Sequence, residues 1–297
     1  MSLLTPDQLQ RLKPNSIPPI RPVPERAATA DLARVYDRTK RGFGVPWMGV
    51  VAMAFAHYPE FYQRLWSSIE PVVATNAFGD ACRELRDCVE AQAGVFAPPA
   101  ISARLAAIGY DTTEVTQITT CNEVFSAGNM PYLLLASLAR ALLEGHEWTG
   151  RGHGSTLPRP ADDMTHPVLM EPHHADPETA ALYDDIRETL GLPFVNTDYR
   201  AFARWPSYFN LAWHDLKPVI QSTAYEPAVS LIHSRAVALA VALPNVTSLS
   251  SEDLIEATAR DADPAEVLAV VQLFQWLLPG LAFNVAYFRA QLTRSTL

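Results

Sequence analysis

The chain is poor in glycine, cysteine and clustered positive charge. Its 297 residues include only 13 glycines and 3 cysteines, and no Lys/Arg run offsets a net charge of −9. Nucleic-acid binding depends on clustered basic residues, so we expect no nucleic-acid partner. A small anionic partner remains compatible, provided that local donors bind it against the overall negative field.

The three cysteines, Cys82, Cys88 and Cys121, form neither a CxxC pair nor a disulfide framework. The six-residue spacing of Cys82 and Cys88 argues against dithiol chemistry of the helical redox type. Three reduced thiols are typical of the cytosol. The N-terminus has neither the charged leader nor the apolar core of a signal peptide. We therefore predict a cytoplasmic protein.

Sustained alternation of apolar and polar residues is also absent, which argues against a substantial sheet. Helix formers are plentiful and 48% of the residues are hydrophobic, so the composition favours an all-α fold. Residues 267–288 carry no charge and are long enough to cross a bilayer. They contain three amide side chains and a Pro279-Gly280 pair that predicts a break. We expect a buried helix, paired with its counterpart over 115–139, and no membrane partner.

What the chain does contain is a duplication. At a constant offset of 147 residues, Tyr36-Asp37 recurs as Tyr183-Asp184, and the match runs without a gap to Pro71-Val72 and Pro218-Val219. Eleven of these 37 positions are identical. Self-similarity at a fixed period indicates duplicated architecture. We therefore predict a tandem helical repeat that forms an intramolecular pseudo-dimer.

The duplication divides the chain into four segments. We expect a Pro-rich, extended N-terminal arm outside the core over 1–27, a first helical repeat over 28–145, a Gly- and Pro-rich linker over 146–175 and a second repeat over 176–297. The expected helices of the first repeat begin near Asp31, Pro46, Pro59, Ala77, Ile101 and Asp111, with a last one after Pro131.

The two repeats differ at one informative position. Val51, in an apolar run, has Asp198 as its counterpart. One interpretation is a cap or first-turn acid that interacts with the helix dipole. The other is a partly buried carboxylate that acts as a general base on water, held where the two halves meet. The residues alone leave both open.

A second polar group lies in Gly128-Asn129-Met130-Pro131, whose counterpart near Leu281 is apolar. Pro131 predicts a helix break, from which the Asn129 carboxamide would project into the interior. An ordinary turn residue is the alternative. Trp47 follows Pro46 and would wall a pocket, although core packing is the default for a tryptophan.

The histidines lack the spacing of metal ligands. His166, His173 and His174 flank Asp162-Asp163 and Glu171, but all lie in the linker without i, i+4 spacing. A phosphate loop and a nucleophile elbow are likewise absent. We predict neither a metal nor another cofactor. The tryptophans that recur in both repeats, at positions 66 and 213, indicate core packing.

Together these features resemble the non-stereospecific (DL-type, group I) 2-haloacid dehalogenases. The resemblance covers about residues 30–290 and is carried by the repeat and three motifs: Val-Pro-Trp of 45–47, Gly-Asn-x-x-Tyr-Leu-Leu-Leu of 128–135 and Asp-aromatic-x-Ala-x-Ala-x-Trp-Pro of 198–206. It implies an all-α pseudo-dimer with one active site between the halves. There an Asp activates a water that attacks the halogen-bearing carbon, giving a 2-hydroxy acid of inverted configuration without an ester intermediate.

The resemblance also implies roles for individual residues. Asp198 matches the base, Asn129 the residue that helps to position the water, and Tyr132 and Trp47 residues of the pocket. Thr75 matches a threonine that is important in relatives. The implied partner is a small anionic organic acid, and a homodimer is plausible by resemblance.

This chain also departs from the family pattern. Gly79 stands where relatives carry a Glu, and Leu277 where they carry a pocket Tyr; Val50 and Gly280 replace nearby aromatic residues. These differences predict a reshaped pocket for the halide and the substrate. The alternative function is a family member that keeps the fold as a small-acid binding module.

Overall fold

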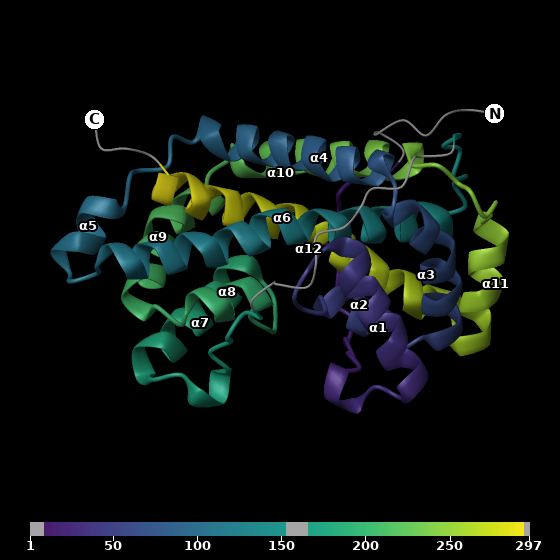
Figure 1. Cartoon of the computed structure of the whole chain (residues 1–297), viewed down its shortest axis with the longest axis horizontal. Coiled ribbons are helices and arrows are strands. Elements are labelled where there is room, and N and C mark those ends of the chain that lie inside the picture. Colours follow the sequence, from purple (N-terminus) through teal and green to yellow (C-terminus); the bar gives the residue numbers. More distant parts are fainter. Residues whose placement is uncertain (1–8, 153–165, 294–297) are drawn as a thin grey trace. The chain divides into compact units, whose positions relative to one another are not determined.

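The computed structural model of the chain describes residues 9–152 and 166–293, and every regular element in these ranges is a helix (Figure 1). The predicted all-α fold is confirmed. The described elements are η2 (Glu25–Ala27), α1 (Ala30–Phe43), α2 (Val50–Phe55), α3 (Pro59–Val73), α4 (Asn76–Val95), α5 (Ser102–Ala107), α6 (Thr112–Leu143), η3 (Pro172–His174), α7 (Pro177–Leu190), α8 (Thr197–Phe202), α9 (Pro206–Ile220), α10 (Tyr225–Ala242), α11 (Ser251–Asp261) and α12 (Pro264–Thr293).

The helices recur in the order that the sequence repeat predicts. The first three helices, α1, α2 and α3, begin and end 147 residues before α7, α8 and α9. Gly44 ends α1 with φ 66° and Gly191 ends α7 with φ 63°. This left-handed conformation suits glycine, which explains why both copies keep it. The pairing of the copies as a pseudo-dimer stays a prediction.

Both copies also share a backbone contact that holds the short second helix. The hydroxyl of Tyr36 donates to the carbonyl of Val23 (2.8 Å), and that of Tyr183 to the carbonyl of Met170 (2.7 Å). The backbone amides of Val23 and Met170 donate in turn to carbonyls in α2 (3.0 Å) and α8 (2.8 Å). The repeated tyrosine is therefore a scaffold residue.

The chain forms two compact units that do not coincide with the repeats. Unit one contains α1, α2 and α3 from the first repeat together with α11 from the second, and unit two contains α7, α8 and α9 together with α5. Helices α4, α6, α10 and α12 contribute residues to both. The units are composed of Met1–Asp87, Gly128–Thr165 and Ser230–Pro279 (unit one) and of Cys88–Ala127, His166–Val229 and Gly280–Leu297 (unit two).

Helices from different repeats contact each other within each unit. In unit one the carboxylate of Asp261, which ends α11, accepts hydrogen bonds from the amides of Glu60 (3.1 Å) and Phe61 (2.8 Å) at the start of α3, beside which α11 lies in Figure 1. In unit two the hydroxyl of Tyr110, which follows α5, accepts from the amide of Tyr208 (3.2 Å) at the start of α9. These side chains satisfy helix amides that have no partner within the helix.

The core contains the aromatic residues that recur in both repeats, as predicted. Trp66 is 1% exposed and Trp213 is fully buried. The aromatic doublets that follow Pro59 and Pro206 are also buried. Their symmetry therefore reflects packing and not chemistry.

The predicted helix breaks at Pro131 and at Pro279-Gly280 are wrong, because α6 and α12 continue through these residues. A proline inside a helix removes one hydrogen bond and costs about 3 kcal/mol. The apolar turns around both prolines are almost fully buried, and their burial outweighs this local cost. The helix expected near Pro46 instead begins at Val50.

The N-terminal arm contributes to the core, which corrects the expectation that it would not. Leu9 is fully buried and packs with Ala141 of α6 and Val237 of α10 in unit one. The guanidinium of Arg11 donates to the carbonyl of Trp276 (2.9 Å) and lies over its ring. The arm from residue 9 is therefore packed onto the long helices, although only η2 in it is helical.

Helix α12 is the one described helix that is long and apolar enough to span a membrane. Of its most apolar 18-residue window, 72% is buried inside the protein. Such burial favours the predicted core helix over a membrane span.

Candidate functional site

Asp198 is the second residue of α8, after the N-cap Asn196, and is only 3% exposed. Its position agrees with a first-turn acid, where the helix dipole favours negative charge. Its burial agrees with a general base that acts on water, because an acid that only interacts with the helix dipole can stay exposed to solvent. The structure thus places in unit two a carboxylate that is almost completely withdrawn from solvent.

Two weakly acidic neighbours respond to the charge of Asp198. The pKa of Cys121, on α6, is raised to about 12 by burial and then by Asp198, while Arg204 lowers it. The pKa of Tyr199 is also raised, mainly by burial and to a smaller extent by Tyr225 and Asp198. The thiol and the phenol therefore stay protonated near neutral pH, and neither competes with the carboxylate as a base.

Asn196 was not singled out by the sequence. It is 9% exposed, and its side-chain oxygen is buried without a hydrogen-bond partner among the described residues. A buried acceptor without a partner costs about 1–3 kcal/mol. The available signal was the counterpart of Asn196 in the first copy, which is Gly49. The two copies therefore differ in polarity at the position of Asn196 as well as at the position of Asp198.

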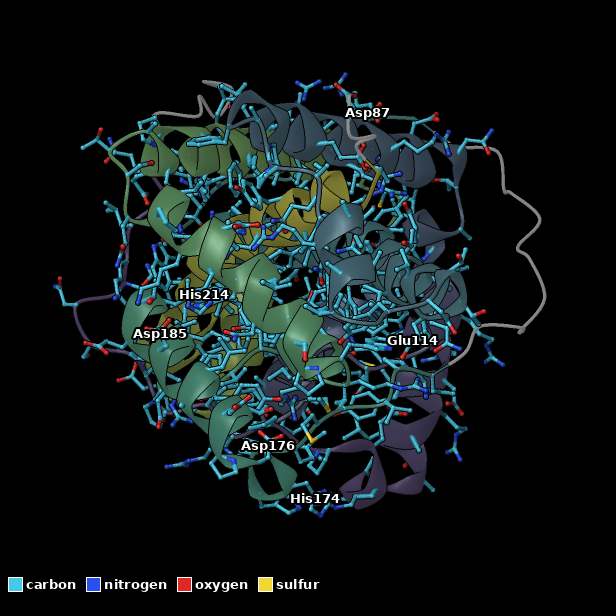
Figure 2. The ribbon with its side chains drawn as sticks, turned by 90° about the vertical axis from the view of Figure 1, so that its left-hand side faces the viewer. Asp87, Glu114, His174, Asp176, Asp185 and His214 are labelled. Atoms are coloured by element: carbon cyan, nitrogen blue, oxygen red, sulfur yellow. The ribbon has the colours of Figure 1, made fainter. Side chains whose placement is uncertain are left out.

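Another acid of unit two, Asp185, has a different environment. Asp185 of α7 accepts hydrogen bonds from the indole of Trp213 (2.8 Å) and from Lys217 (2.6 Å), and lies beside His214 of α9 (Figure 2). Burial tends to raise the pKa of Asp185, but the hydrogen bonds from Lys217 and Trp213 leave it below its usual value. Asp185 is therefore held as an ion-paired structural carboxylate.

Unit one holds the remaining four predicted residues and brings two of them into contact. Tyr132 of α6 is 2% exposed; its hydroxyl donates to the carbonyl of Trp47 (2.9 Å) and accepts from the amide of Gly49 (2.8 Å). The ring of Tyr132 meets Phe43 edge to face, with centroids 5.1 Å apart. The hydroxyl thus fixes the turn before α2 through its backbone.

Two glycines make this contact possible. A Cβ atom at Gly49 would lie 2.7 Å from the ring of Tyr132, and one at Gly128 would lie 2.2 Å from the ring of Trp47. Any side chain at these positions would displace the aromatic rings. The motifs at 45–47 and 128–135, which the sequence shows as separate, therefore form one packing unit.

Asn129 and Thr75 are both buried at 5% exposure. The prediction that Asn129 projects from a helix break is wrong, because Asn129 lies inside the continuous α6. The Thr75 hydroxyl donates to the carbonyl of Val72 (2.7 Å) and accepts from the amide of Phe78 (3.4 Å) in the first turn of α4. Thr75 therefore has the contacts of a helix cap.

The described histidines of the linker belong to no group of side chains that could hold a metal ion. His166, His173 and His174 are exposed, and His174 lies at the lower edge of Figure 2. Asp162-Asp163 lies outside the described residues. Within the described ranges no group of three or more His, Cys, Asp and Glu side chains could hold a metal ion. Independence from metals stays a prediction.

The chain is similar to known families and proteins. The family model described as "Halocarboxylic acid dehydrogenase DehI" matches residues 46–199. An (R)-2-haloacid dehalogenase of Rhizobium sp. (strain NHG3) is 48% identical over 82% of this chain and 96% of that protein. An (R)-2-haloacid dehalogenase of Pseudomonas putida is 37% identical over 92% of each. A configuration-inverting 2-haloacid dehalogenase of Pseudomonas sp. (strain 113) is 25% identical over 71% of each.

Solved structures are also similar. The complex of a D-2-haloacid dehalogenase with L-LA is 36% identical, with a TM-score of 0.87 over 96% of this chain and 100% of that one. A mutant D-2-haloacid dehalogenase in complex with D-2-CPA is 36% identical, with a TM-score of 0.87 over 95% of this chain and 99% of that one.

Proposed function

Because the chain belongs to the halocarboxylic acid (DehI) family, we propose that it is a hydrolase of carbon–halide bonds that converts 2-haloalkanoic acids into 2-hydroxy acids. The observation that carries the proposal is the buried Asp198 in the copy of the repeat whose twin has Val51. The relatives described above act on 2-haloacids by name, and they cover most of the chain.

We propose that the substrate is the (R)-enantiomer. The relatives at 48% and 37% identity are named for (R)-2-haloacids, whereas the relatives named without an enantiomer are 25% and 21% identical. The non-stereospecific subtype suggested by the motifs is therefore the second candidate. The ligands of the solved relatives, D-2-CPA and L-LA, carry opposite configuration labels, as expected for substrate and product of an inverting reaction.

In the proposed reaction Asp198 acts as a general base on water. The carboxylate accepts a proton while the water oxygen attacks C2 from the side opposite the halogen, and the halide leaves with the bonding electron pair. One displacement gives one inversion, so no ester forms on the protein. The proton held by Asp198 then returns to solvent. Only water and the haloacid are consumed, so the reaction needs no cofactor.

The burial of Asp198 and the environment of Asn196 support this role. Asp198 is only 3% exposed, so bulk water has little access to its carboxylate. The buried oxygen of Asn196 has no partner among the described residues, and a water molecule shared with Asp198 would satisfy it. A single bound water would then serve both groups.

The remaining residues are assigned by resemblance and by their contacts. We propose that Asn129 orients the attacking water, and that Trp47 and Tyr132 shape the pocket for a small anionic acid. The hydroxyl of Tyr132 is bound to the turn before α2, so its contribution is shape rather than a free donor. Thr75 acts through the start of α4. We also propose a cytoplasmic homodimer.

The test is chloride release from (R)- and (S)-2-chloropropionate by the wild-type protein and by Asp198→Asn. We expect release from the (R)-acid with (S)-lactate as product, and a loss of about 10²–10⁴-fold in the variant. Equal release by both proteins would remove Asp198 from the mechanism. Release from both enantiomers would establish the non-stereospecific subtype, and binding without release would favour the small-acid binding module.

A further inference from the structure

A buried chain of hydrogen bonds crosses unit two through Asn284 of α12. The hydroxyl of Tyr225 donates to the side-chain oxygen of Asn284 (3.0 Å), and the side-chain nitrogen of Asn284 donates to the hydroxyl of Tyr199 (2.8 Å). The three residues are 7%, 1% and 0% exposed. Tyr199 follows Asp198 directly in α8, so the chain ends next to the proposed base.

One amide side chain joins both hydroxyls of this chain. The oxygen of Asn284 accepts from Tyr225 and its nitrogen donates to Tyr199, so both polar atoms of the buried amide have a partner. Burial keeps the pKa of Tyr199 far above its usual value, and the hydroxyl stays neutral. The chain therefore persists over the working pH range.

Helix α8 depends on such contacts because it has only six residues. A helix of this length is not stable by itself, and its position is set by tertiary contacts. Tyr199 binds α12 through Asn284, and one nitrogen of Arg200 donates two hydrogen bonds to Glu171 (2.8 Å each). The two residues that follow Asp198 thus anchor α8 on separate elements.

The first copy of the repeat has no such side-chain anchors. The counterparts of Tyr199 and Arg200 are Ala52 and Met53, which cannot form these bonds. The counterpart of Asn284, at the 152-residue offset of α6 and α12, is Tyr132, which binds the backbone of the turn instead. The side-chain anchors therefore occur only in the copy that carries the acid.

We propose that Asn284, acting through the hydroxyl of Tyr199, is a positioning residue that holds Asp198 in the geometry required for attack by water. This inference rests on the proposed role of Asp198 as the base. A general base must lie within hydrogen-bond reach of the proton that it removes, and a displacement of about 1 Å can cost about 100-fold in rate.

The first test compares Asn284→Leu with the matched control Gln291→Leu. Gln291 is fully buried on the same helix and donates to Asp215 of α9 (2.8 Å), so its replacement removes a similar bond that does not reach α8. We expect Asn284→Leu to lower kcat for (R)-2-chloropropionate by about 10- to 100-fold, with KM within about threefold. In Gln291→Leu we expect kcat to fall by less than about threefold.

A double-mutant cycle tests the route through Tyr199. Tyr199→Phe keeps the ring and removes only the hydroxyl, so it should fold even if Asn284→Leu does not, and its kcat should fall by about 5- to 20-fold. If Asn284 acts through this hydroxyl, the double variant should be no slower than Asn284→Leu alone. Unchanged kcat in Tyr199→Phe, or a multiplicative loss in the double variant, would overturn the inference.

The same assay separates this inference from the proposed function. If Asp198→Asn is inactive while Asn284→Leu retains as much kcat as Gln291→Leu, the positioning role fails and Asp198 remains the base. If Asp198→Asn keeps wild-type kcat, the proposed role of Asp198 fails and the positioning role fails with it. Loss in Asp198→Asn and in Asn284→Leu, but not in the control, supports both.

Discussion

The two copies of the repeat hold their short second helix by different means. In the first copy Tyr132 binds the turn before α2 through backbone groups, and the helix carries the buried, apolar Val51. In the second copy Asn284 binds the side chain of Tyr199, and α8 presents the buried Asp198. The shared backbone contacts make the scaffold, and the polar side chains of one copy make the candidate site.

Physical cost explains why the polar groups are concentrated. Burying a carboxylate or an amide is unfavourable unless partners compensate for the lost water. A second acid at the Val51 position would need its own set of partners, which the first copy lacks. A duplicated scaffold therefore allows one copy to keep apolar packing while the other carries the chemistry.

The largest effect is expected when the second copy is made like the first. Asp198→Val should lower chloride release by about 10²–10⁴-fold because it removes the base. The fold should be retained, since Val51 occupies the equivalent place in the first copy. Chloride release and thermal unfolding, measured on the same preparation, would check this. Loss of activity together with loss of helical structure would contradict the equivalence of the two positions.

Removal of the contact between the Tyr132 hydroxyl and the turn before α2, in the first copy, should mainly lower stability. Tyr132→Phe deletes two hydrogen bonds and leaves the buried amide of Gly49 without its partner. We expect the free energy of unfolding to fall by about 3 kcal/mol, as measured by urea denaturation. Tyr199→Phe, which removes a hydroxyl that binds a side chain instead, should cost less stability and more kcat. The reverse order would break the comparison.

Helix α10 should make the stability of the protein depend on pH through a buried histidine that its counterpart α4 lacks. His233 of α10 is 1% exposed, whereas Glu84, its counterpart on α4, forms a surface ion pair with Arg235. Burial, and then the charges of Arg140 and Arg11, lower the pKa of His233 to about 3. Between the ordinary value of 6.5 and about 3, the unfolded chain binds a proton that the folded protein does not.

Stability should therefore fall as the pH falls through this window. His233 should account for a loss of about 2 kcal/mol between pH 7 and pH 5. His233→Leu should remove this part of the pH dependence in urea titrations at both pH values. His174→Leu, at an exposed histidine (Figure 2), serves as the control for loss of a histidine at the surface. An identical slope in both variants would contradict the assignment.

The smallest effect should appear at Cys121, whose counterpart is the buried Leu273. Burial raises the pKa of Cys121 more than the charge of Asp198 does. Asp198→Asn should therefore increase its alkylation by iodoacetamide at neutral pH only about two- to fivefold. Cys88, whose pKa is raised by burial alone, serves as the internal control in peptide mass spectrometry. An unchanged ratio of the two rates would show that Asp198 does not act on this thiol.

Much of the fold was predictable from local pattern. The 147-residue offset places three pairs of helices correctly, and Gly44 and Gly191 end α1 and α7 in the left-handed conformation that glycine favours. The mismatch between Val51 and Asp198 identified the candidate base because an acid in an apolar position is rare. The motifs predicted a 2-haloacid dehalogenase family, which the comparisons confirm, whereas the non-stereospecific subtype is not carried by the more similar relatives.

The errors of the sequence-based prediction have a common cause. Pro131 and Pro279 predict helix ends by local rules, yet burial of the surrounding turns keeps α6 and α12 continuous. Leu9 lies in a Pro-rich arm that resembles a linker, and it enters the core only because α6 and α10 meet beneath it. In each case a contact between distant segments outweighs the local preference.

The sequence by itself determined the helical class, the duplication and the position of the acid, because periodicity, turn residues and residue identity act over a few neighbouring positions. Only the tertiary structure decided that Asp198 is buried, that Gly128 makes room for Trp47, and that Asn284 reaches Tyr199. These contacts join residues 81 to 85 positions apart, and a single sequence carries no distance between them. The environment of the candidate site therefore depends on packing between helices that lie far apart in the sequence of one copy, which local residue patterns do not encode.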